Sequence, residues 1–240
     1  MIKLEHTVLP SSDQMEFVIE GMRNPMNSWE KSDSVVCSCN DSMCICCEEN
    51  HTEQCSNGFV LGDNDHSLMQ RLSNAGTDHR KFMRMMPVFV RITAPLYWWK
   101  EFDTYKVGTV ANSCSTMHKI QENEFTKDDF SCEHLDIRTK ALLEVTIKIL
   151  NDYRKLYIEY NQDDFEIRGC TSKKDIWWKM IQSLPSSYNQ TRNVMLNYEV
   201  LANMYHSRKN HKLDEWRKFC KWIENLPYSD LIIMEDLKRD

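Results

Sequence analysis

Residues 92–115 hold the densest group of side chains suited to binding an anion. Beside one cation, Lys106, this segment carries small hydroxyl and amide side chains: Thr109, Asn112, Ser113 and Ser115. Such groups near an ammonium can hold an anionic, hydrogen-bonding ligand such as a nucleotide. Turn formation around Gly108 is the alternative interpretation of the same residues.

A second group of reactive side chains is a cluster of cysteines between positions 37 and 55. Its members are Cys37, Cys39, Cys44, Cys46, Cys47 and Cys55. Thiolates bind zinc or iron strongly, so these residues are candidate ligands for zinc or an iron–sulfur cluster. Their spacing lacks the paired Cys-x-x-Cys of ordinary zinc modules, and a reduced, exposed loop is the alternative. The other cysteines are scattered and are predicted to be packing residues: Cys114, Cys132, Cys170 and Cys220.

Composition limits the partners of the chain. The 240 residues include 30 Lys and Arg against 36 Asp and Glu, a net charge of -6. This balance argues against sequence-independent nucleic-acid binding. The N-terminus lacks an apolar segment of the signal-peptide type, and no apolar run is long enough to span a bilayer. The sequence therefore predicts a cytoplasmic protein without a membrane partner.

The first half of the chain reads as alternating strands, helices and loops. Residues 2–9 and 88–92 are predicted strands, and residues 79–86 a short basic helix. A helix begins after Ser11 or Ser12, with an inner stripe of Met15, Val18, Ile19 and Met22. Residues 24–62 are predicted to be a long polar loop, followed by a helix that Asp63 or Asn64 caps.

The second half reads as mostly helical. Helices are predicted at 135–160, 177–184, 191–205 and 213–226. The first of these has an apolar stripe expected to face the core: Leu142, Val145, Ile149, Tyr153, Leu156 and Tyr160. No internal repeat or low-complexity linker divides the chain, so residues 1–240 are predicted to form a single domain with a Cys-rich polar loop at about 24–62.

Several landmarks then follow one another in an informative order. Asp78-His79 precedes Ile92-Thr-Ala-Pro-Leu-Tyr-Trp-Trp99, and Leu184-Pro185 precedes Asn197, Asn203 and Arg208. From roughly residue 79 to residue 216 this order resembles the flavin-dependent thymidylate synthase (ThyX) family. The resemblance implies an α+β fold in which a mixed, largely antiparallel sheet packs with a helical second half.

The resemblance also implies roles for individual residues. It places His79, Asn197 and Asn203 at a flavin, FAD, and it places Arg208 at the phosphate of dUMP. The signature loop would add three further contacts to the phosphate: Lys106, Thr109 and Ser115. A homo-oligomer, a tetramer with sites between subunits, is implied as well.

The sequence departs from the family at several cations. Residues 104–106 read Thr-Tyr-Lys where the family has Arg-His-Arg, and Met117 and Ile181 stand at positions of two further arginines. Each charge-assisted bond to a phosphate contributes on the order of 1.5–3 kcal/mol, so two lost bonds lower dUMP affinity by roughly a hundredfold or more. His118 and Lys119, one turn on, could replace part of that charge.

Two functions follow. The first is a divergent ThyX-like protein that binds a nucleotide or flavin and converts dUMP to dTMP, in which reduced flavin supplies hydride to a methylene group on the pyrimidine. The alternative is a non-catalytic binding or regulatory protein on the same fold. It would sequester a nucleotide or contact a protein partner, with the cysteine loop as its recognition element.

Overall fold

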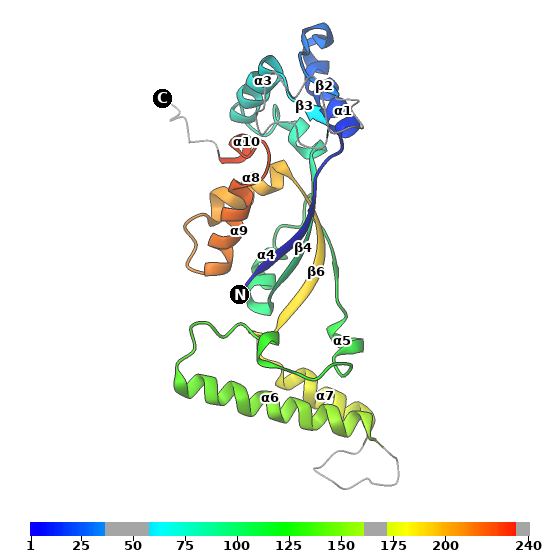
Figure 1. The fold of residues 1–240 in the computed structure, drawn as a ribbon, viewed down its shortest axis with the longest axis vertical. Coiled ribbons are helices and arrows are strands. Elements are labelled where there is room, and N and C mark those ends of the chain that lie inside the picture. Colours follow the sequence, from blue (N-terminus) through cyan, green and yellow to red (C-terminus); the bar gives the residue numbers. More distant parts are fainter. Residues whose placement is uncertain (37–57, 161–171, 234–240) are drawn as a thin grey trace. The chain divides into compact units, whose positions relative to one another are not determined.

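A computed structural model describes residues 1–36, 58–160 and 172–233 of the chain (Figure 1). It confirms the predicted α+β class, with an antiparallel sheet and many helices. The described chain separates into two compact units. Unit 1 comprises Met1–Lys3, Ile92–Thr104 and Asn112–Arg192, and unit 2 comprises Leu4–Arg91, Tyr105–Ala111 and Asn193–Asp240. The sequence predicts a single domain, and the division into two compact units does not test that prediction.

The main sheet has four strands in the order β1-β4-β6-β5. Their bounds are Lys3–Val8 for β1, Pro87–Pro95 for β4, Val110–Ser113 for β5 and Asn189–Asn197 for β6. Along β4 every second side chain is buried, as expected for a strand that turns one face to the core. The hydroxyls of Thr93 on β4 and Thr191 on β6 lie 2.7 Å apart.

In unit 2, helix α1 spans Ser12–Arg23 and confirms the predicted cap and inner stripe. The Ser11 hydroxyl accepts a hydrogen bond from the Gln14 backbone, and the Gln14 side chain accepts one from the Ser11 backbone. The buried residues of α1 are the four predicted ones, Met15, Val18, Ile19 and Met22, together with Arg23.

The prediction of an uninterrupted polar loop over 24–62 is wrong for the part that the structure describes. Two 3₁₀ turns, η1 (Asn24–Met26) and η2 (Trp29–Lys31), follow α1. Strand β2 (Val35–Val36) then pairs antiparallel with β3 (Phe59–Val60). Backbone pairing and the buried ring of Phe59 order these ends although the sequence between them is polar. The six candidate metal-ligand cysteines lie outside the described residues.

Helix α3 (Asp63–Asn74) is capped by a residue distant in sequence. The carboxylate of Asp33 accepts hydrogen bonds from the backbone nitrogens of Asn64, at 2.8 Å, and Asp65, at 3.0 Å. The residue at the capping position is Gly62, which has no side chain to do this. The predicted cap at Asp63 or Asn64 is therefore wrong, because the capping group comes from the segment before β2.

The predicted helix at 191–205 is wrong in its first half. Residues up to Asn197 form strand β6, in which Val194 and Leu196 alternate as buried side chains. Helix α8 begins only at Tyr198 and ends at Arg208. It packs in unit 2 with η3 (Lys81–Met85), α9 (Asp214–Glu224) and α10 (Asp230–Ile233).

Unit 1 holds the remaining helices and a core of its own. These are α4 (Leu96–Phe102), α5 (Thr116–Lys119), η4 (Lys127–Asp129), α6 (Ile137–Ile158) and α7 (Lys173–Ser183). Helices α6 and α7 lie side by side (Figure 1). On α4, Trp98 and Trp99 are buried, and the Trp99 indole donates to the Gln190 carbonyl at 3.0 Å.

Helix α6 shows the predicted period, but only part of the predicted stripe packs inward: Tyr153 packs against the core of unit 1. Leu142, Val145 and Ile149, expected to face the core, are 65%, 54% and 42% exposed. The buried positions are Leu143 and Leu150, which pack with the aromatic core of unit 1. Apolar residues occur on more than one side of this helix, so periodicity alone did not decide which side faces inward. Among the described residues, no helix is long and apolar enough to cross a membrane.

Candidate nucleotide and flavin site

Helix α8 organises the predicted site residues of unit 2. The Oδ1 atom of Asn197 accepts a hydrogen bond from the Val200 backbone nitrogen at 2.9 Å and caps the helix. The backbone nitrogen of Tyr198 donates to the Met86 carbonyl at 3.2 Å, which ties the start of α8 to the segment just after η3. The helix is buried along most of its length, so the polar side chains at its two ends are held on a rigid element.

The loop Tyr105–Ala111 lies directly against the start of α8. Gly108 has a φ of +78°, and a Cβ atom added there would lie 2.8 Å from Val200 and 2.9 Å from the Nδ2 atom of Asn197. Only glycine permits both this backbone conformation and this approach. The loop carries the exposed Lys106, and the Thr109 hydroxyl donates to the carbonyl of Tyr105. Gly108, next to Thr109 in this loop, thus lies at the same end of α8 as Asn197.

Arg208, at the other end of α8, is held by two aromatic rings. Its Nε atom donates to the Tyr105 hydroxyl at 2.9 Å. Its guanidinium carbon lies 4.8 Å from the ring centre of Trp216 and 5.6 Å from that of Tyr105. Stacking on rings fixes the plane of a guanidinium, which favours recognition of a planar or bidentate anion. Arg208 thus contacts the first residue of the loop that carries Lys106.

Asn203 belongs to a second cluster, beside η3. Its Oδ1 atom accepts a hydrogen bond from Nη2 of Arg80 at 3.1 Å. Arg80 and Arg84 both form ion pairs with Glu199, on the first turn of α8. His79 is the exposed neighbour of Arg80 in sequence. The three positions predicted along this helix therefore divide between two clusters. Asn197 and Arg208 contact the loop Tyr105–Ala111, and Asn203 contacts Arg80.

The Nε atom of Arg80 provides a further observation. It is buried and lies 3.4 Å from Glu199, yet it makes no hydrogen bond to any described residue. A buried cationic donor in this state has a desolvation cost that a ligand oxygen would offset. The basic run around His79 pointed to this cluster, but the sequence did not indicate that Glu199 would organise it.

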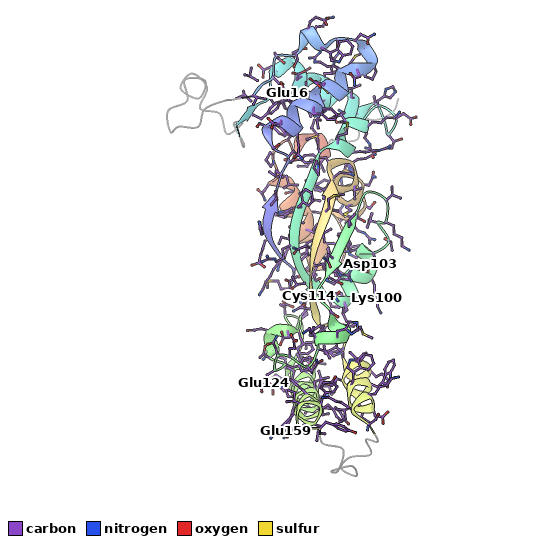
Figure 2. The ribbon with its side chains drawn as sticks, turned by 90° about the vertical axis from the view of Figure 1, so that its right-hand side faces the viewer. Glu16, Lys100, Asp103, Cys114, Glu124 and Glu159 are labelled. Carbon is purple, nitrogen blue, oxygen red and sulfur yellow. The ribbon has the colours of Figure 1, made fainter. Side chains whose placement is uncertain are left out.

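Ser115 belongs to unit 1. Its hydroxyl accepts a hydrogen bond from the His118 backbone nitrogen at 3.1 Å and caps α5. It borders a cavity of about 420 Å³, as do Lys119, Tyr188 and Gln190. The Gln190 amide donates to the Cys114 carbonyl at 3.2 Å (Cys114 is labelled in Figure 2).

The side chain of Tyr188, which borders this cavity, has a shifted pKa. Desolvation, together with the nearby Asp129 and Cys114, raises the pKa of Tyr188 above its ordinary value. The shift widens the pH range over which Tyr188 keeps a neutral hydroxyl in this wall of the cavity. Of the replacement cations considered from the sequence, Lys119 borders the cavity and pairs with Glu122, while His118 is exposed.

The described residues contain no group of three or more His, Cys, Asp or Glu side chains that could hold a metal ion. The zinc or iron site predicted at Cys37–Cys55 falls on residues outside that description and stays a prediction. Of the scattered cysteines expected to be packing residues, Cys220 is buried and Cys132 half-buried. Cys114 is exposed, and its prediction as a packing residue is wrong.

Comparison with known proteins identifies the fold. No family model and no curated protein sequence matches the chain. Among solved structures, the chain is similar to the flavin-dependent thymidylate synthase ThyX from Helicobacter pylori complexed with FAD and dUMP, with a TM-score of 0.59, 16% identity and 98% of each chain covered. A second structure of Helicobacter pylori ThyX with FAD and dUMP matches with a TM-score of 0.58, 14% identity and coverage of 100% of this chain and 99% of that one. The chain therefore has a ThyX-like fold over its full length.

Proposed function

We propose that this protein binds a flavin and a pyrimidine nucleotide, as a divergent relative of the ThyX enzymes. The observation that carries the proposal is the arrangement on α8, where Asn197 and Arg208 meet the loop bearing Lys106. It is supported by the full-length similarity to structures that contain FAD and dUMP.

In this proposal the polar residues of unit 2 divide between two ligands. Lys106, Thr109 and Arg208 bind the nucleotide phosphate. The loop itself carries the exposed ammonium of Lys106, and the guanidinium of Arg208, which is held by two aromatic rings, contacts the first residue of that loop. Ser115, in unit 1, is the further phosphate ligand that the family resemblance implies. A phosphate here gains charge-assisted hydrogen bonds worth on the order of 1.5–3 kcal/mol each.

His79, Asn197 and Asn203 are the proposed contacts of the flavin. The buried Nε atom of Arg80, which lacks a hydrogen bond to a described residue, fits a group rich in acceptor atoms such as a flavin. A reduced flavin, when bound, supplies hydride to the pyrimidine. The chain's own residues orient the two ligands, and no described side chain is needed as a nucleophile.

The experiment is to add FAD and dUMP separately to purified protein. Flavin binding gives absorbance at about 450 nm that bleaches on reduction, and dUMP raises the melting temperature. Lys106→Ala is expected to weaken dUMP binding about tenfold or more. The matched control is Lys100→Ala, which removes an equally exposed ammonium from α4 (labelled in Figure 2). Protein that takes up neither ligand would overturn the proposal.

A non-catalytic binding protein is the second candidate, and one contact favours it. Tyr105 stands within the segment where the family has Arg-His-Arg, and here it supports Arg208. A protein that binds dUMP but takes up no FAD and forms no dTMP would establish this second function.

We also propose a homo-oligomer. The support is the exposed apolar stripe of α6, formed by Leu142, Val145 and Ile149. Contiguous exposed apolar side chains of this kind mark interaction surfaces. The reduced cytoplasm remains the proposed location of the protein.

A further inference from the structure

Unit 2 contains a cavity that the proposed function does not use. It measures about 260 Å³ and lies between α1, η2 and the β2–β3 pair. Ile19 and Phe59, both buried, give it an apolar wall, and Val36 extends that wall. At about 30 Å³ for each water-sized group, it has room for roughly eight or nine such groups. The cavity therefore fits a small molecule with an apolar part.

A buried cation borders this cavity. Arg23 is only 3% exposed. Its Nε atom donates to Asp65 at 2.6 Å, and its Nη1 atom donates to the Ser28 carbonyl at 3.2 Å. Its Nη2 atom is buried and has no hydrogen-bond partner among the described residues. The third nitrogen of a buried guanidinium thus still requires an acceptor.

One carboxylate oxygen of Asp65, Oδ2, has its acceptor capacity taken by other donors. It accepts hydrogen bonds from the hydroxyls of Ser32 and Ser34 at 2.7 and 2.6 Å. Backbone nitrogens of Asp33 and Ser34 donate to the same oxygen. The other oxygen, Oδ1, accepts from Nε of Arg23, and neither oxygen accepts from Nη2. Among the described residues no acceptor serves Nη2 of Arg23, which makes it a candidate contact for a ligand oxygen.

The rim of the cavity has the opposite charge. Glu16 and Glu20 both line it from one side of α1, four residues apart (Glu16 is labelled in Figure 2). Like charges at this spacing repel each other, and a cation placed between them relieves the repulsion. Trp29 completes the rim with an indole that is 49% exposed and donates to Asn24 at 2.8 Å, which fixes its ring. Indole and carboxylates together favour an ammonium group.

We propose that this cavity binds a small zwitterion of the apolar α-amino-acid class. The carboxylate lies at Nη2 of Arg23, the ammonium lies between Glu16 and Glu20, and the side chain contacts Ile19 and Phe59. Each polar end meets a group of opposite charge, and the apolar part meets the apolar wall. This site is separate from the residues of α8 and does not depend on flavin or nucleotide binding.

Calorimetric titration of the full chain with L-leucine, L-methionine and L-phenylalanine tests the proposal. At least one is expected to bind with a stoichiometry of one. Analogues that lack one charged end, 3-phenylpropionate and 2-phenylethylamine, are expected to bind at least about tenfold more weakly than L-phenylalanine if that is the amino acid bound. No binding of any of the three amino acids at about 10 mM would overturn the proposal.

Variants locate the binding without disturbing the buried ion pair. The double variant Glu16→Gln with Glu20→Gln keeps the size of both exposed side chains and is expected to lower affinity about tenfold or more. Glu30→Gln is the matched control, because Glu30 is exposed on η2 but does not line the cavity. Equal affinity in the double variant and the control would place the binding elsewhere and overturn the proposal. Thermal unfolding of each variant shows that the fold is retained.

Discussion

Asp65 shows how a single carboxylate can hold several segments together. Burial raises the pKa of this group, but hydrogen bonds from Ser34, Ser32 and Arg23 and the charge of Arg23 lower it by more, so the net pKa lies below its ordinary value. A carboxyl whose pKa is lowered in the folded state stabilises that state above the unfolded pKa, about 3.9. This contribution is lost as the pH falls through the folded pKa.

We therefore expect Asp65→Asn to reduce the free energy of unfolding at neutral pH by about 3–5 kcal/mol, because Arg23 is left as a buried, unpaired charge. The difference from the unsubstituted protein should shrink below about pH 4, where the carboxyl becomes protonated. Urea titrations at several pH values measure this. Asp63→Asn, an exposed change on the same helix turn, is the control, and an equal loss in both variants would contradict the assignment.

The described cysteines differ in reactivity for a physical reason. Burial, reinforced by Glu224 and opposed by Arg208, raises the pKa of Cys220 to about 11. At about pH 8 roughly one in a thousand such thiols is ionised. Cys114 is exposed. Iodoacetamide should therefore label Cys114 and leave Cys220 unmodified in folded protein, as read by peptide mass spectrometry. Equal labelling of the two would show that Cys220 is not buried in solution.

At the scale of elements, the contact between the loop Tyr105–Ala111 and α8 is the most constrained. Gly108→Ala places a methyl group against Val200 and Asn197 and strains a positive φ. We expect a loss of about 1–3 kcal/mol in unfolding free energy and weaker dUMP binding. Gly76→Ala is the control, since Gly76 also has a positive φ but nothing lies within 4 Å of an added Cβ. Equal losses would mean that the close approach to α8 has no energetic consequence.

The sequence predicted elements well where caps and periodicity agreed. Helix α1 is the clearest case, because Ser11 and the stripe beginning at Met15 point to one start and one face. The prediction of a helix over 191–205 failed because Asn197 is both the last residue of strand β6 and the cap of helix α8. Local propensity does not reveal the sheet partners that decide this boundary.

The candidate site residues stay predictions, and the structure adds contacts among them that the sequence did not indicate. The family order placed His79, Asn203 and Arg208, and the structure puts all three in unit 2. The contacts of Arg208 with Tyr105 and of Arg80 with Asn203 join residues more than 100 positions apart. Local sequence patterns do not indicate contacts between residues so far apart, so the partners of Arg208 and Asn203 could not be predicted.

At the scale of the whole molecule, the exposed stripe of α6 leads to a prediction about assembly. Replacing Leu142 and Val145 by Glu should shift the protein to a smaller species, because charges would be buried in an apolar contact. Light scattering after size-exclusion chromatography measures the mass. Lys148→Glu, an exposed change on the same helix, is the control. An unchanged mass in the double variant would exclude α6 as the subunit contact.

The pairing of Val36 with Phe59 has a consequence for how this chain tolerates a break in its backbone. The two residues are cross-strand partners although 23 positions separate them in the sequence. Asp33 and Asp65 fasten the two flanks to each other, because each carboxylate accepts a hydrogen bond from the other's backbone nitrogen. These contacts do not depend on a covalent connection between the two strands. A protein produced as two pieces, divided between Val36 and Phe59, is therefore expected to reassemble through the β2–β3 pair.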